Sequence, residues 1–156
     1  MPERKTMERA KEDLREGKRP STAAGEFVRE EMEHIREGKH GAKSTKQAIA
    51  IGLSKARRAG VPLKPPGEGQ TSQSTRESAE RAYEIGQGER EPRAPSRKRK
   101  RAISKSLKRE GRRAASKAAL SRQAKRSARK RQGTSRSAKA AAGRAAATRV
   151  RTGIAE

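Results

Sequence analysis

Apolar residues recur at helical spacing in three stretches of the first 64 residues, and glycine or proline follows each stretch. This 3.6-residue period is typical of amphipathic helices that bury one face. The first stretch predicts a helix from about Glu3 to Glu16, which Gly17 ends and Pro20 keeps from resuming. Its apolar face holds Met7, Ala10 and Leu14.

The second stretch predicts a helix from about Ala23 to Glu37, capped by Ser21 or Thr22 and ended by Gly38. The apolar positions of this helix are Ala24, Phe27, Val28, Met32 and Ile35. Its acidic residues are expected to form a solvated face. An alternative is that these carboxylates pair with the basic end of the chain.

The third stretch predicts a helix from about Lys46 to Ala59, capped by Ser44 or Thr45. Its apolar positions are Ala48, Ile49, Ile51, Leu53 and Ala56. Gly25 and Gly52 fall inside the second and third helices, at a cost of about 1 kcal/mol each relative to alanine. A glycine in a helix can permit close packing of a neighbouring helix, and we consider that role for both.

The remainder of the chain lacks this period. Residues 65–95 are rich in Pro, Gly, Gln and Ser and predict a flexible linker, with a short helix possible over 75–85. Residues 96–156 are mainly Arg, Lys, Ala and Ser. We therefore predict a mainly α fold: a small three-helix module over 1–64, the linker, and a largely disordered basic tail over 96–156. In the tail, helix is induced by binding and broken near Gly111, Gly133 and Gly143.

The distribution of charge gives the first indication of function. The chain has 156 residues and a formal net charge of +24, and only 29% of its residues are hydrophobic. Residues 1–64 carry 16 basic and 10 acidic side chains, residues 65–95 carry 4 and 6, and residues 96–156 carry 22 and 2. The concentration of positive charge in residues 96–156 is typical of a nucleic-acid-binding tail attached to a domain of more balanced charge.

The candidate nucleic-acid contacts begin with a run of five cations and continue through the tail. They are Arg97, Lys98, Arg99, Lys100, Arg101, Lys105, Lys108, Arg109, Arg112, Arg113, Lys117, Arg122, Lys125, Arg126, Arg129, Lys130 and Arg131. On a helical wheel these cations surround the axis, which suits phosphate neutralisation better than base reading. The tail has no aromatic residue on which bases could stack, so duplex DNA is favoured over single strands and RNA.

The third helix adds Lys46, Lys55, Arg57 and Arg58 as possible backbone contacts, in the manner of a helix-turn-helix. However, the seven residues 38–44 form a longer turn than that motif uses, which favours plain packing of this helix.

Other classes of function find little support in the sequence. Cysteine is absent, no nucleophile–base pair is recognisable, and we expect neither catalysis nor a cofactor. Glu30, His34 and Glu37 share a helix face that could hold a metal, but such trios are usually accidental, and no metal is expected. The alanine-rich tail lacks the bulky apolar face of a membrane-surface helix. The N-terminus has no apolar leader, so the cytoplasm and its nucleoid are the expected location.

Two motifs carry a family resemblance: MERAKEDLREGKRPSTAAGEFVREEMEHIREGKHG, from Met7, and STKQAIAIGLSKARRAGV, from Ser44. Over Thr6 to Val61 the chain resembles a family of small basic bacterial proteins with a domain of unknown function. The resemblance implies a bacterial cytoplasmic setting and carries no activity or functional residue. The tail is similar to bacterial histone-like tails in composition alone.

The sequence thus favours a sequence-nonspecific, nucleoid-associated DNA-binding protein of histone-like character. Two alternatives stay open. Residues 1–64 could bind a protein partner or self-associate while the tail tethers them to nucleic acid, or the protein could be RNA-binding or ribosome-associated.

Overall fold

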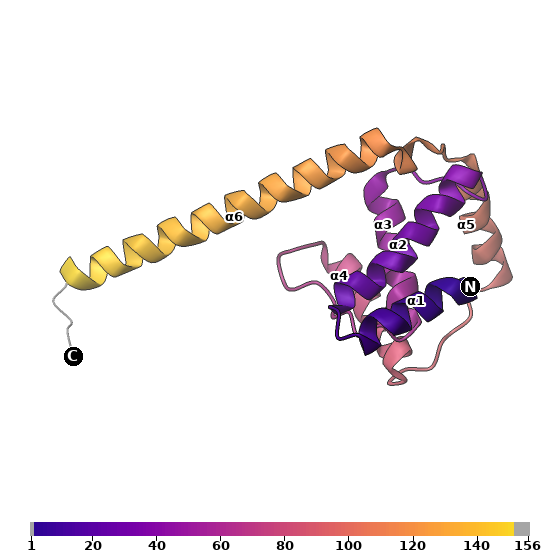
Figure 1. Cartoon of the computed structure of the whole chain (residues 1–156), viewed down its shortest axis with the longest axis horizontal. Helices are drawn as coiled ribbons and strands as arrows, with labels where there is room; N and C mark the ends of the chain where they lie inside the picture. Colours follow the sequence, from indigo (N-terminus) through magenta and orange to yellow (C-terminus); the bar gives the residue numbers. More distant parts are fainter. Residues whose placement is uncertain (1, 152–156) are drawn as a thin grey trace. The chain divides into compact units, whose positions relative to one another are not determined.

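The computed structural model describes residues 2–151, with side chains through Gly133 and at Ser135. Within this range the chain is helical and contains no strand, which confirms the prediction of a mainly α protein. Figure 1 shows α1 (Arg4–Arg15), α2 (Pro20–Glu37), α3 (Thr45–Arg58), α4 (Gln73–Gln87), α5 (Arg97–Arg109) and α6 (Lys117–Arg151). The 3-10 turn η1 (Arg113–Ala115) lies between α5 and α6 in the chain. One compact unit extends to Ala119, and a second unit starts at Leu120.

The starts of α2 and α3 show how local sequence sets helix boundaries. Pro20 opens α2 at its first position, three residues before the predicted start, and neither Ser21 nor Thr22 acts as its cap. Proline suits this position because its fixed φ is helical and its missing N–H would have no helical partner. In α3 the cap is Ser44, whose hydroxyl accepts a hydrogen bond from the Gln47 N–H at 3.2 Å.

The core lies where α1 and α3 pack against α2, around the fully buried ring of Phe27. Its buried residues are Ala10, Ala23, Ala24, Phe27, Ala56 and Val61, with Met7, Leu14, Leu53, Ala59 and Leu63 packed against them. Most of these positions were predicted from the helical period. Because the buried residues are mainly alanines, the helix backbones approach one another closely.

At Gly52, helix α3 lies against the backbone of α2. A Cβ at Gly52 would lie 2.7 Å from the Cα of Val28, so a side chain there would force the two helices apart. Gly25 differs, since a Cβ at that position would meet nothing within 4 Å. The packing role is therefore confirmed for Gly52, whereas for Gly25 it is wrong.

Part of residues 65–95 is folded against the helical core, unlike a flexible linker. Helix α4 is four residues longer than predicted, is capped by the Ser72 hydroxyl, and packs against α3. Its residues Ala79 and Ala82 are buried, and at Gly86 a Cβ would clash with the Arg57 carbonyl. A helix of this composition is marginal alone in water, so its contact with α3 accounts for its formation.

The beginning of the predicted tail is also part of the compact unit. The Gly41 N–H donates to the Leu107 carbonyl at 2.9 Å, and the Ala42 N–H donates to the Gly111 carbonyl at 3.3 Å. The buried hydroxyl of Thr45 then donates to the Ala114 carbonyl at 2.7 Å. These bonds attach the C-terminal end of α5 to the segment between α2 and α3, and the turn η1 to the first residue of α3.

The expected helix breaks are correct at one glycine out of three. Gly111 lies between α5 and η1, but α6 continues through Gly133 and Gly143 without interruption. Alanine, arginine and lysine are strong helix formers. Their summed helix propensity outweighs the cost of about 1 kcal/mol for each glycine. Disorder of the tail in the free chain stays a prediction, and its residues 152–156 lie outside the described residues. Within the part described, no helix is long and apolar enough to cross a membrane.

Candidate nucleic-acid interface

Helix α5 carries the most concentrated set of candidate contacts in the compact unit. The Ser96 hydroxyl caps it by accepting from the Arg99 N–H at 3.3 Å. Along one face runs an open hollow of about 530 Å³, lined by Lys100, Arg101, Ser104, Lys105, Lys108 and Arg109. At 1.5 Å per residue, these five cations and one hydroxyl span about 13 Å of helix.

A second hollow, of about 360 Å³, lies along the apolar side of α5. Ile103 and Leu107 line it together with Pro95, and Lys39 and His40 contribute from the segment after α2. Lys100, Ser104 and Lys108 line both hollows. From Arg101 onward the cations of α5 share one side of the helix, and Ile103 and Leu107 lie on the other. The expectation that cations surround the axis holds for the first turn, Arg97 to Lys100, and is wrong for the rest of this helix, because Ile103 and Leu107 occupy the other side.

The other predicted tail contacts are exposed as well. This group comprises Arg112, Arg113, Lys117, Arg122, Lys125, Arg126, Arg129, Lys130 and Arg131. The Arg112 guanidinium donates to the Arg36 carbonyl at 3.4 Å but stays open to solvent. Lys130 apart, no candidate cation within the described stretch 97–131 is ion-paired with a carboxylate.

The four cations of α3 divide into two kinds. Lys46 and Arg58 are exposed. Arg57 is buried, with Nε donating to the Leu63 carbonyl at 3.1 Å and Nη2 to the Lys64 carbonyl at 3.4 Å. Burial lowers the pKa of its guanidinium. Arg57 therefore fastens the chain that follows α3, and we remove it from the interface.

Lys55 is likewise engaged inside the fold. Its Nζ lies 2.7 Å from Glu31 Oε2 and 3.7 Å from Glu30 Oε1. These carboxylates are 0% and 3% exposed, so the prediction of a solvated acidic face is wrong for both. Neither do they pair with the tail within the described residues, since their lysine partner comes from α3. A buried carboxylate requires such a partner because desolvating a lone charge is costly.

The sequence contained a signal for this burial. Phe27, Glu31 and Ile35 follow one another at intervals of four residues, which places them on one helix face. Phe27 and Ile35 belong to the predicted apolar stripe and are fully buried, and Glu31 lies between them. The prediction of one solvated acidic face did not take account of the position of Glu31 on the apolar stripe.

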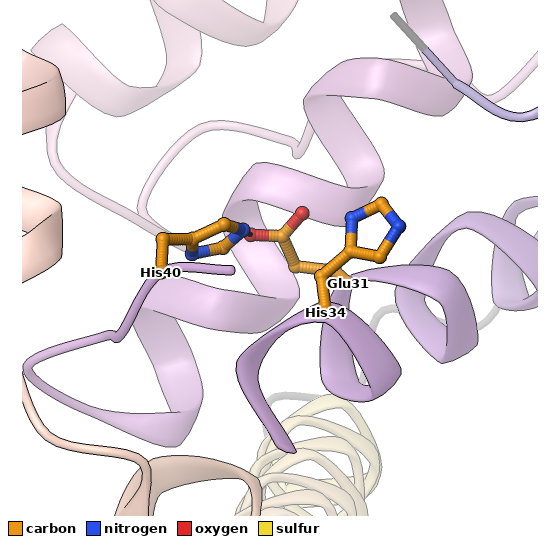
Figure 2. A group of neighbouring side chains, drawn as sticks. All are labelled: Glu31, His34 and His40. Carbon is orange, nitrogen blue, oxygen red and sulfur yellow. Dashed lines mark ion pairs between the residues drawn. The ribbon is translucent and has the colours of Figure 1, made fainter. Parts of the chain in front are cut away.

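The two histidines approach this buried carboxylate. Figure 2 shows Glu31 and His34 on α2, with His40 from the following segment turned toward the Glu31 carboxylate. The three possible ligand atoms lie within 4.8 Å of one another. The trio considered from helical spacing differs, because Glu37 is directed to Lys39 Nζ, at 3.0 Å. Spacing along one helix could not reveal His40, which lies beyond the helix end.

Glu3 connects the start of the chain to this cluster. Its Oε1 is 3.0 Å from His34 Nε2, and its N–H donates to Glu30 Oε2 at 3.1 Å. The hydrogen bond with His34, and after it the charge of Lys39, lower the pKa of the Glu3 carboxyl.

One comparison with known proteins gives a match. Residues 15–66 match the profile of a family of unknown function, DUF6496, which confirms the resemblance to an uncharacterised domain. No curated protein and no solved structure matches the chain. The matched segment contains α2 and α3, whereas α5 and α6 lie outside it. The function of the basic helices must therefore be argued from their own chemistry.

Proposed function

We propose that this protein binds duplex DNA without sequence preference, as a nucleoid-associated, histone-like protein that neutralises phosphates. The observation that carries the proposal is the basic face of α5, where five exposed cations line one open hollow. Ion pairs to carboxylates do not occupy these cations within the described residues, so they are available to a polyanion.

The charge density of this face fits that of a duplex. B-DNA carries one negative charge per about 1.7 Å of helix axis, so about 13 Å of duplex presents roughly eight phosphates. The five cations of α5 supply a comparable density over that length. The exposed cations of α6 extend the available positive charge beyond this face.

The side chains favour phosphate contact over base reading. The hollow on α5 is lined by lysine, arginine and one serine, without the asparagine or glutamine that reads adenine. The chain has one Phe and one Tyr, and Phe27 is buried in the core. Stacking of single-stranded bases on aromatic rings is therefore a poor fit to this surface.

The test replaces the five cations of the α5 face, Lys100, Arg101, Lys105, Lys108 and Arg109, with glutamine. A control replaces five exposed cations elsewhere with glutamine: Arg4, Lys5, Lys11, Arg15 and Arg19. If the full chain neutralises about eight phosphates, the slope of log K against log salt is near −7. Loss of five contacts should make that slope less negative by about 4 to 5 units. We expect this change for the α5 variant and a much smaller one for the control.

The same titration tests the alternatives. Equal slopes for the two variants would contradict a specific role for α5. They would show that only the net charge of the protein determines DNA binding. Stronger binding to structured RNA than to duplex DNA at equal salt would favour an RNA-binding protein. Wild-type affinity for DNA in the α5 variant, with capture of an identified protein by residues 1–119, would favour an interaction module.

A further inference from the structure

The side chain of His40 is oriented by its own backbone. Its Nδ1 lies 3.2 Å from the carbonyl oxygen of Gly41, and a carbonyl can only accept. The proton of a neutral ring is therefore on Nδ1, which leaves a lone pair on Nε2. That nitrogen lies 3.3 Å from Glu31 Oε1, so two lone pairs face each other.

A cation between these two atoms would resolve the repulsion. Glu31 is 0% exposed, and neither of its oxygens is in hydrogen-bonding geometry with a donor. Lys55 approaches Oε2 at 2.7 Å and leaves Oε1 to His40. The cation facing Oε1 is either a proton on His40 or a metal ion.

His34 offers a third donor with the support that metal-binding histidines usually have. Its Nε2 can donate to Glu3 Oε1 at 3.0 Å, which leaves Nδ1 as the ligand atom. A carboxylate that accepts the second ring N–H in this way fixes the tautomer and orientation of a ligand histidine. On the same side, Glu30 Oε1 is 4.0 Å from Nδ1, is buried and receives no hydrogen bond.

We propose that Glu31, His34 and His40 form a binding site for a divalent transition metal, with Zn²⁺ as the best fit. Zinc–ligand bonds of 2.0–2.2 Å in a tetrahedron place neighbouring ligand atoms about 3.3 to 3.4 Å apart. The His40–Glu31 separation of 3.3 Å already has this value. The ligand atom of His34 must move by up to about 1.5 Å to reach it, which a side-chain rotation of this partly exposed residue provides. Glu30 Oε1 or water supplies the fourth position.

The donor set favours a transition metal over the alkaline-earth ions Mg²⁺ and Ca²⁺. Two imidazole nitrogens and a carboxylate suit Zn²⁺ and its neighbours, whereas Mg²⁺ and Ca²⁺ prefer all-oxygen sites. Lys55 balances one of the two buried carboxylates in either state, and Lys39 lies 3.5 Å from Glu3 at the edge of the cluster. None of the three ligands belongs to the basic face of α5, although His40 lines the adjoining hollow together with Lys100 and Lys108. The metal proposal does not rest on the proposed DNA binding.

The test is a titration of the full, tag-free chain with Co²⁺ and then Zn²⁺, without DNA. Cobalt absorption reports imidazole coordination and geometry directly, so the readout does not depend on stability. We expect one Co²⁺ per chain with a tetrahedral spectrum, displaced by Zn²⁺ and not by excess Mg²⁺. His34→Ala and His40→Ala should each weaken Zn²⁺ binding at least tenfold. The matched control Glu37→Gln, on the same helix, should bind like the wild type.

Two results would overturn the proposal. The first is wild-type protein that gives no saturable cobalt spectrum at neutral pH, which would assign the cation to a proton on His40. The second is a spectrum that persists in the double variant His34→Ala/His40→Ala, because these are the two histidines of the chain. Circular dichroism of each variant verifies that it is folded, and the wild-type spectrum tests the proposal even where a variant is not.

Discussion

At the scale of single residues, two glycines inside packed helices have opposite roles. Gly52 faces the backbone of Val28 across the α2–α3 contact, and Gly25 faces open space. Glycine thus permits close packing of two helices at position 52, whereas at position 25 it only lowers the helix propensity of α2. The period of apolar residues could not distinguish them, because the distinction depends on which helix lies opposite.

This contrast predicts opposite effects of alanine. Gly52→Ala should destabilise the protein by roughly 1 to 3 kcal/mol, because its Cβ would overlap the α2 backbone. Gly25→Ala should stabilise it by up to about 1 kcal/mol through helix propensity. Urea unfolding of both variants measures the two free energies. Equal changes of one sign would contradict the packing described for Gly52.

At the scale of helices and turns, the boundaries of α1, α2 and α3 were largely predictable, whereas the docking of later elements was not. Caps and stop residues such as Ser44 and Gly38 act on their own neighbours, so the sequence shows them directly. The place of η1 depends instead on Thr45 and Arg36, which lie 69 and 79 residues before the carbonyls that they bind. Burial of Glu31 and the approach of His40 depend equally on tertiary contacts.

The attachment of η1 can be tested at Thr45. Thr45→Val keeps the shape of the side chain but leaves the buried Ala114 carbonyl without its hydrogen bond. The expected loss is about 1 to 3 kcal/mol, with faster amide exchange at Ala115 and Ser116. Thr71→Val, at an exposed hydroxyl, is the control and should change stability by less than about 0.5 kcal/mol. Unchanged exchange in the Thr45 variant would contradict the proposed attachment.

At the scale of the whole molecule, the residues of the hydrophobic core and the basic residues occupy different parts of the chain. All the residues of the hydrophobic core cluster lie before residue 64. The segment from Leu120 onward contributes 11 of the 42 basic residues and none of that cluster. Removing the C-terminal segment should therefore lower the attraction to a polyanion while leaving the stability of the core nearly unchanged.

A chain ending at Ala119 should unfold cooperatively, with a midpoint close to that of the full protein. It should also bind duplex DNA more weakly, with a less negative salt slope, because it retains α5 and loses most of the α6 cations. Calorimetry and a salt titration measure these two properties. A broad, noncooperative transition would show that residues after Ala119 contribute to folding, and an unchanged slope would remove α6 from the interface.

The hydrogen bonds that hold Ala114 and Ala115 place an anchored turn between two basic helices. On a duplex, α5 and α6 would then act as two linked binding segments, and release of one would leave the other in place. Under the proposed DNA binding, rebinding from such a half-released state would be intramolecular, so complete dissociation should be slow in dilute DNA. A second duplex could then capture the released segment, so the residence time should shorten as the concentration of free DNA rises. The anchored turn therefore predicts that the protein would move between neighbouring duplexes by direct transfer, without passing through solution.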